Sequence, residues 1–370
     1  MAQRSSASPD VAHLRSTANL QLESTLFGRL PPEIREMVYA ECWVVSGLRQ
    51  HVFLDCHGRQ LGHSPCIRTS GEPDERNYEI QRLMSCRRRN RRGPRSRSSV
   101  AVDRLWAARF SSDWHEHWPC EEMLPRTPEK VAHNDHSNHG HRSLFLPILL
   151  LCKRTYIEAL TSLYSSVTFV FTDINSALRC LSSPFHPPTA LLRSLIFSLA
   201  LPFRSLHEQR DYYSPSLCDG PWARLCTTLS DMARFASLRS VTIRLDLDED
   251  DGKGAGDWRR VRERWVLCAV RGVLARHLTV QLPHVVHLEQ TRPYQYLDGD
   301  QAPFQIERYP KIRWVSSGDG RVVEPLVDLL PSRSASPVSL VDSLDLVERR
   351  SKLRRATRGL RCFLLGEMSD

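Results

Sequence analysis

Long apolar runs are missing from this sequence, whose longest uninterrupted apolar stretch is the nine residues Leu144–Cys152. A helix that crosses a membrane needs about 20 apolar residues, so we expect no such helix. Met1–Asp10 contains no apolar run either, and we therefore expect no signal peptide. Together these absences favour a soluble intracellular protein, and they leave the choice between nucleus and cytoplasm open.

Paired cysteine motifs are also missing. The chain has 11 cysteines, an odd number, and none of them forms a Cys-x-x-Cys motif. Cys152, Cys180, Cys226 and Cys268 occupy apolar positions of expected helices, where a free thiol packs like a small hydrophobic side chain. The sequence therefore predicts a reduced chain without a disulfide framework.

Catalytic and cofactor motifs are absent too. The sequence has no Gly-x-Ser-x-Gly, no P-loop and no His-Glu-x-x-His, so we predict a non-enzymatic protein without catalytic residues or a cofactor. The tract His133–His141 holds four histidines, and His115, His117 and Cys120 lie upstream of it. Structural zinc sites usually include a closely spaced cysteine pair, which this tract lacks, so we predict no metal site.

The strongest structural pattern present is in residues 143–172. Leu149, Cys152, Tyr156, Leu160 and Leu163 recur at the spacing of one helix face. The residues after 166 then alternate with a period of two and are rich in β-branched and aromatic side chains, which is typical of a strand. This stretch therefore predicts a helix that leads directly into a buried strand.

Three later stretches repeat the strand pattern: Leu192–Leu201, Leu238–Leu247 and Ala275–Pro283. Amphipathic helical segments separate them, at 174–181, 222–235 and 258–277. Successive βα units of this size favour a sheet that is at least partly parallel. We predict an α+β fold with a mixed or partly parallel sheet, built from irregular, leucine-rich-repeat-like βα units with helices on one face.

The N-terminal helix is expected to start within Leu26–Tyr39, where Pro31 and Pro32 suit a first turn and Glu33 suits the positive end of the helix dipole. The motif Leu30-Pro-Pro-Glu-Ile34 resembles the opening helix of F-box and F-box-like domains. The block Leu151-Cys-Lys-Arg-Thr-Tyr-Ile-Glu-Ala-Leu160 is similar to a second block of the same group. That group consists of fungal F-box-like proteins that carry a domain of unknown function.

The resemblance implies a protein-interaction module, an adaptor or substrate-recognition protein without enzymatic activity. In F-box proteins the opening helix docks on the adaptor subunit of a cullin–RING ubiquitin ligase. The same residues could instead form the buried face of a core helix, and their exposure would distinguish the two interpretations. The candidate docking residues are Leu30, Pro31, Pro32, Ile34 and Val38.

A second candidate function comes from charge. The formal net charge is +9, from 51 lysines and arginines against 42 acidic residues, and most of the excess lies in two arginine-rich runs, the first of them between residues 87 and 97. Such a run could pair with phosphates or serve as a nuclear address, and it could also be simply a solvated loop. The alternative function is therefore that of a nuclear nucleic-acid-associated protein. The residues of the run are Arg87, Arg88, Arg89, Arg91, Arg92, Arg95 and Arg97.

Composition and pattern divide the chain into six parts. We predict disorder over 1–22 and over the Arg- and His-rich insertion 85–142, because these parts are polar and lack periodicity. The remaining parts are an F-box-like helix with a β-hairpin (23–84), the βα core (143–290), a C-terminal hairpin extension (291–330), and a Ser/Pro linker with a basic helix (331–370).

Overall fold

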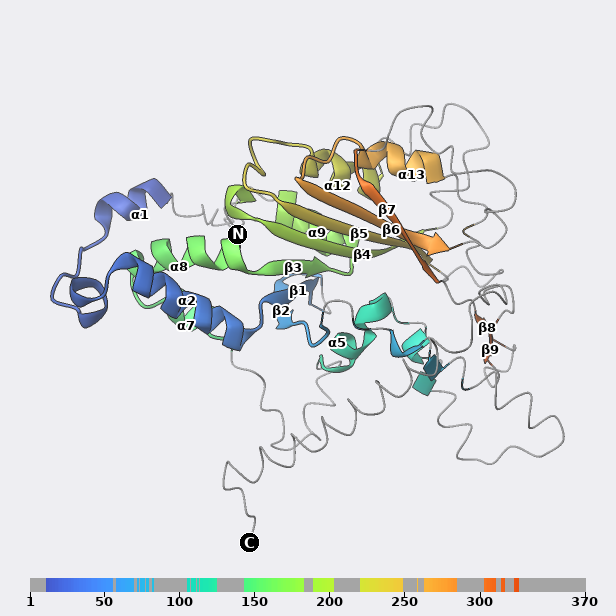
Figure 1. Ribbon diagram of the computed structural model, residues 1–370, viewed down its shortest axis with the longest axis horizontal. Coiled ribbons are helices and arrows are strands. Elements are labelled where there is room, and N and C mark those ends of the chain that lie inside the picture. Colours follow the sequence, from blue (N-terminus) through green and yellow to red (C-terminus); the bar gives the residue numbers. More distant parts are fainter. Residues whose placement is uncertain are drawn as a thin grey trace, which may run out of the picture. The chain divides into compact units, whose positions relative to one another are not determined.

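The computed structural model of the chain is shown in Figure 1. All described residues lie in one compact unit, Met1–Leu326. The structure describes residues 11–55, 58–69, 72, 74–76, 78–79, 82, 105–106, 108–110, 112, 114–124, 143–182, 189–202, 220–248, 258, 263–284, 303–310, 314–316 and 323–325.

A seven-stranded sheet in the order β2-β1-β3-β4-β5-β6-β7 forms the centre of the fold. β2 is an antiparallel edge strand that forms a hairpin with β1, and every other neighbouring pair is parallel. The strands are β1 (Arg49–Leu54), β2 (Leu61–Pro65), β3 (Thr168–Phe171), β4 (Ser194–Pro202), β5 (Ser240–Asp248), β6 (His277–His284) and β7 (Gln305–Pro310).

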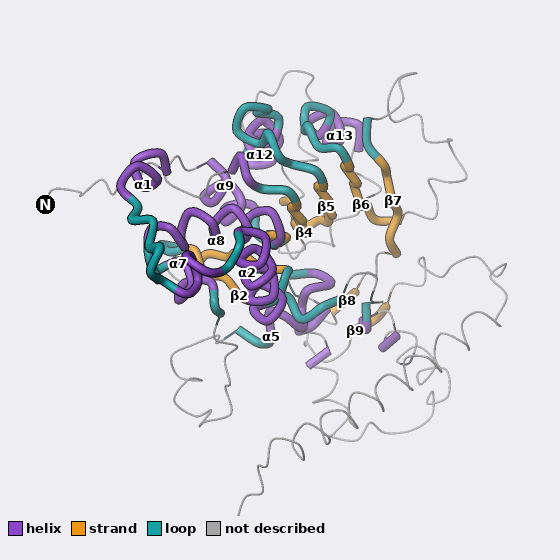
Figure 2. Tube along the Cα trace, turned by 60° about the vertical axis from the view of Figure 1, so that its left-hand side comes forward, coloured by secondary structure: helices purple, strands orange, loops and turns teal. Residues whose placement is uncertain are grey.

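Helices precede β3, β4, β5 and β6 in the described part of the chain, and each of these strands lies beside the next one. Because parallel crossovers are almost always right-handed, this order places the connecting helices on one face of the sheet. Figures 1 and 2 show α9, α12 and α13 together on that face. The predicted α+β fold with a partly parallel sheet is therefore confirmed. The connecting helices are α8 (Lys153–Ser166), α9 (Ile174–Ser182), α12 (Pro221–Leu229) and α13 (Glu263–Val270).

The main core lies between these helices and the sheet. The parallel register places Phe171, Phe197, Ile243 and Val280 side by side in one row, and all four side chains are buried. The period of two in the sequence thus gives each strand one apolar face, and the amphipathic helices cover that face. The rings of Phe171 and Phe197 are stacked with their centroids 5.4 Å apart.

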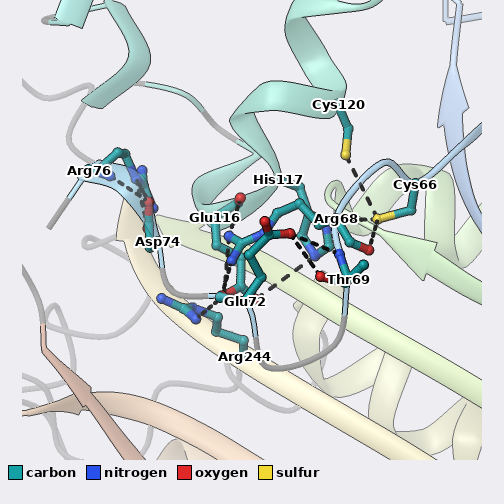
Figure 3. Close-up of polar contacts among 10 residues, drawn as sticks. All are labelled: Cys66, Arg68, Thr69, Glu72, Asp74, Arg76, Glu116, His117, Cys120 and Arg244. Atoms are coloured by element: carbon teal, nitrogen blue, oxygen red, sulfur yellow. Dashed lines mark hydrogen bonds and ion pairs between the residues drawn. The ribbon is translucent and has the colours of Figure 1, made fainter. Parts of the chain in front are cut away.

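The opposite face of the sheet carries polar residues and has a different cover. Arg244 on β5 lies on this face, and its Nη1 donates to Glu116 Oε2 at 2.6 Å (Figure 3). Glu116 belongs to η2 (His115–His117), a single turn that continues into α5 (Trp118–Glu122). Arg68 donates to the backbone oxygen of Glu116 and so joins the chain after β2 to the same cover. Ion pairs between the sheet and the η2–α5 segment therefore hold this segment on the polar face.

The remaining elements surround the sheet or lie at its ends. α2 packs on α8, with α7 beside them, and β8 and β9 form a separate antiparallel pair. This pair lies within the C-terminal extension 291–330, where a hairpin was predicted. No helix in the described part of the chain is long and apolar enough to span a membrane. The elements are α1 (Val11–Thr17), η1 (Thr25–Arg29), α2 (Pro32–Ser46), α7 (Phe145–Leu149), η3 (Thr189–Leu191), β8 (Trp314–Ser316) and β9 (Val323–Pro325).

Three segments differ from the sequence-based expectation. Val11–Thr17 form α1, within the range 1–22 that we expected to be disordered. Residues 114–124 are helical and partly buried, within the insertion 85–142, because ion pairs and ring contacts hold them on the sheet. The sheet also extends past the expected boundary at residue 290, since β7 pairs with β6.

Candidate functional site

The helix α2 carries the residues that the sequence marked as a docking motif. Pro31 precedes the helix and Pro32 is its first residue, a position where no backbone N–H is needed. Glu33 lies in the first turn, and the helix ends at Ser46 before Gly47, whose φ of 91° suits glycine. The local sequence therefore determines both ends of the helix.

One side of α2 is buried against α8, and it is formed by polar and aromatic side chains. Arg35 makes a two-point ion pair with Glu158 of α8, through Nε and Nη2 at 2.8 Å each. Its Nη1 also donates to the backbone oxygen of Leu30 at 2.6 Å. Trp43 Nε1 donates to Ser162 Oγ at 3.1 Å. These contacts fix the rotation of α2 about its axis.

Tyr39 extends the same contact surface. Burial and the nearby Glu158 carboxylate raise the pKa of Tyr39 to about 12, so its hydroxyl stays protonated at neutral pH. That hydroxyl lies 3.4 Å from Glu158 Oε2, a long hydrogen bond. Glu158 therefore accepts hydrogen bonds from two side chains of α2, and it is the centre of the joint between the two helices.

The opposite side of α2 is apolar and exposed. Ile34 is 41% exposed, Val38 42% and Val45 67%. With Met37 and Val44 they span about 120° of the helix circumference, away from the buried side. Leu48, just beyond the helix, is exposed as well. Among the described residues, α2 thus presents an apolar stripe to solvent, which the exposed Glu41 interrupts.

The structure places the predicted docking residues at the surface and not in the core. Ile34 and Val38 belong to the exposed stripe, Pro31 and Pro32 are exposed at its N-terminal end, and Leu30 is partly buried. The second predicted group, the arginines of the run 87–97, lies outside the described residues.

Lowering the pH should weaken the joint between α2 and α8. Burial alone raises the pKa of Glu158, but the hydrogen bonds and charges of Arg35 and Arg154 outweigh it, so the pKa lies below its usual value of 4.5. The unfolded chain therefore binds more protons at this residue than the folded chain. The resulting stabilisation is complete above about pH 4.5 and is lost as the pH falls through the lower folded pKa.

Urea unfolding between about pH 7 and about pH 3 checks this prediction. The difference in unfolding free energy between the wild type and Glu158→Gln should shrink as the pH falls, because both side chains are then uncharged. A difference that stays constant over this range would contradict it.

A second group of side chains lies at the open end of the β1–β2 hairpin, away from its turn. His51 of β1, Cys66 after β2, His117 of η2 and Cys120 of α5 place their ligand atoms within 4.8 Å of one another. Cys66 Sγ lies 3.8 Å from Cys120 Sγ and 3.5 Å from His117 Nδ1. Figure 3 shows Cys66 and Cys120 facing each other.

The surroundings of this His/Cys cluster lower the pKa values of Cys120 and His51. A hydrogen bond from Cys66 lowers the pKa of Cys120 to about 7 although burial raises it, and the backbone N–H groups of residues 67 and 68 add to the lowering. Burial lowers the pKa of His51, so its ring is held in the neutral form that binds metals. Trp114 covers His51, with the ring centroids 4.7 Å apart.

Sequence reasoning missed this cluster. In the sequence His117 and Cys120 lie near the tract His133–His141, whereas their partners in the cluster are more than 50 residues upstream, in the hairpin. The short spacing His117-x-x-Cys120 was the available local signal.

Comparison with known proteins gives a family without an activity. Residues 19–106 and 104–293 match the family model described as Domain of unknown function (DUF7730). These two segments include α2, the His/Cys cluster and strands β1 to β6. No curated protein and no solved structure matches the chain.

Proposed function

The chain belongs to the family of the domain of unknown function DUF7730, and we propose that it binds another protein through the exposed apolar stripe of α2. This stripe consists of Ile34, Met37, Val38, Val44 and Val45.

The observation that carries the proposal is that apolar side chains line the solvent side of α2 while a charged residue faces its packed side. A core helix would bury Ile34 and Val38 and expose Arg35, and α2 has the reverse arrangement. Holding Arg35 in a buried position requires Glu158 as a partner, since an unpaired buried charge is costly. Contiguous exposed apolar surface on a soluble domain is typical of interaction sites.

The chemistry around the stripe indicates the kind of partner. Glu33, Glu36 and Glu41 are exposed on the same helix, whereas its arginine is buried in the ion pair with Glu158. A complementary surface is therefore an apolar groove with a basic rim. An amphipathic helix that inserts its apolar side chains into such a groove is a common mode of protein recognition.

The partner we propose is the adaptor subunit of a cullin–RING ubiquitin ligase. The resemblance of Leu30–Ile34 to the opening helix of F-box domains supports this choice, and the exposure of Ile34 agrees with it. In this role the chain would act without catalysis, as a recognition or adaptor protein that brings another protein to the ligase.

Binding to the purified adaptor, measured by isothermal titration calorimetry, tests the proposal. The double variant Ile34→Asp/Val38→Asp should bind at least about tenfold more weakly than the wild type, because truncating central apolar contacts of an interface typically costs more than 1 kcal/mol. Leu30→Ala/Pro31→Ala should also weaken binding, since these residues form the N-terminal end of the same surface.

The matched control is Met232→Asp/Leu274→Asp, which changes two exposed apolar residues that lie outside α2. This variant should bind as tightly as the wild type. A wild-type chain that does not bind the adaptor, or an α2 variant that binds like the control, would overturn the proposal.

A further inference from the structure

We propose that His51, Cys66, His117 and Cys120 form a structural zinc site that fastens the η2–α5 segment to the β1–β2 hairpin. This inference is independent of the α2 proposal, because it concerns different residues and a different ligand.

The distances within the cluster fit tetrahedral zinc. With Zn–S bonds of about 2.3 Å and Zn–N bonds of about 2.0–2.1 Å, two sulfur ligands lie about 3.8 Å apart and a sulfur and a nitrogen about 3.5 Å apart. The separations observed here are 3.8 Å between the sulfurs of Cys66 and Cys120, and 3.5 Å between Cys66 Sγ and His117 Nδ1. Two edges of the cluster thus match a zinc-binding tetrahedron, and all four ligand atoms lie within 4.8 Å of one another, so small side-chain shifts would bring them around one ion.

His51 gives an independent reason to expect a ligand. Its side chain is 0% exposed, and neither ring nitrogen has a hydrogen-bond partner of ordinary geometry, although the Cys66 thiol lies near enough to interact with the ring. A buried polar group without a partner costs about 1–3 kcal/mol, so native proteins rarely leave one in place. A metal bound to one of these nitrogens would remove part of that cost.

The set of ligands indicates which metal and which role. Two thiolates and two neutral imidazoles compensate the charge of a divalent cation, and this Cys₂His₂ set is typical of zinc. All four side chains are buried or partly buried, and the ring of Trp114 packs on His51. A site with four protein ligands has no position left for a substrate, so its role is structural and not catalytic.

The positions of the ligands in the chain indicate what the zinc would hold together. His51 and Cys66 belong to the hairpin at the edge of the sheet, whereas His117 and Cys120 come from the segment that covers the polar face of the sheet. Glu116, next to His117, pairs with Arg244 of β5. The metal would therefore keep Glu116 in place. It would also link Cys66 to His117, and the part of the chain between these two residues contains the arginine run.

Two other interpretations of the cluster are testable alongside zinc. Cys66 and Cys120 could be joined by a disulfide bond, which would leave both histidines without a role. The histidine tract 133–141 could also bind metal adventitiously when the protein is purified. A disulfide predicts a chain without zinc at this cluster, and adventitious binding predicts metal that is lost when the histidine tract is replaced.

The experiment is elemental analysis of the full-length chain, expressed with zinc in the medium and purified without chelators. We expect about one zinc per chain in the wild type and in Cys268→Ser, which changes an exposed cysteine outside the cluster. Replacing the histidines of the tract 133–141 with serine should leave the zinc in place. Cys120→Ser and His51→Ala should lose it.

A second measurement covers variants that fail to fold. Cobalt added to the chelator-treated wild type should give the strong visible bands of tetrahedral coordination and a thiolate charge-transfer band. His51→Cys supplies another zinc ligand and should keep the metal, whereas His51→Ala should weaken zinc binding by more than the 10–100-fold that loss of a supporting residue typically costs.

Three outcomes would overturn the proposal: a wild-type chain without zinc, zinc that disappears with the histidine tract, and a Cys66–Cys120 disulfide detected by mass spectrometry of the unreduced protein. Zinc retained in full by Cys120→Ser would also contradict it, because only three of the four ligands would then remain.

Discussion

Replacing Trp43 with alanine should lower the free energy of unfolding by about 3–5 kcal/mol. Trp43 is 0% exposed and lies in a second, smaller core, which is formed by Tyr39, Trp43, Phe145, Ala159, Leu163 and Val167. Its ring is 5.4 Å from that of Phe145. Its truncation removes a large buried apolar surface and leaves a cavity between α2 and α8. It also leaves Ser162 Oγ without the indole N–H that donates to it.

Urea denaturation followed by circular dichroism measures this loss, and Trp43→Phe is the matched control. Phenylalanine keeps most of the ring but has no N–H, so it should cost clearly less than alanine. Equal losses in the two variants would mean that the hydrogen bond to Ser162, and not the packing of the ring, dominates the contribution of Trp43.

This prediction also concerns function, because the smaller core holds α2 in the orientation that exposes Ile34 and Val38. Trp43→Ala should therefore weaken adaptor binding although Trp43 itself is buried. Trp43→Phe should retain most of the binding. The Ile34→Asp/Val38→Asp variant should also weaken binding, but its stability should be nearly unchanged.

Replacing Glu263 with alanine should cost about as much, 3–5 kcal/mol, for an electrostatic reason. Glu263 is buried at the start of α13 and accepts two hydrogen bonds from Arg308 of β7, at 2.6 and 2.7 Å. Trp258 Nε1 also donates to it, at 2.5 Å. Removal of the carboxylate takes the Glu263 counter-charge from a mostly buried guanidinium and breaks this contact between β7 and α13.

The double variant Glu263→Leu/Arg308→Leu separates the charge effect from simple loss of contact. Breaking a buried ion pair by removing one partner is more costly than replacing both partners by apolar residues of similar size. The double variant should therefore be more stable than Glu263→Ala in the same urea titration. If it is less stable, the ion pair contributes more than the cost of burying its charges.

The strands of the core and the helices between them could be predicted because their signals are local. In β4, β5 and β6, apolar residues alternate along the chain, and that period of two determines which face of the strand is buried. β7 was missed because Gln305–Pro310 contains mostly polar and charged residues. Its place in the sheet depends on pairing with β6 and on the ion pair between Arg308 and Glu263, which join residues distant in the chain.

The burial of α2 shows where a local pattern is insufficient. Ile34, Met37 and Val38 have the spacing of a core face, and hydrophobicity alone would place them inside. They are outside because Arg35, Tyr39 and Trp43 find their partners on α8, more than 100 residues further along the chain. The sequence provides both sides of the helix, and the contact with α8 decides which of them is buried.

The sequence by itself determined the helices, the βα units, the partly parallel sheet and the position of the Leu30–Ile34 motif, since each depends on spacing within about 10–20 residues. Only the tertiary structure decided that the motif is exposed and that His51 and Cys66 meet His117 and Cys120. Both results require residues far apart in the chain to come together. The entropy cost of closing such long loops is offset by the contacts that form between the distant residues. A pattern read along the chain contains no information on which distant residues will meet.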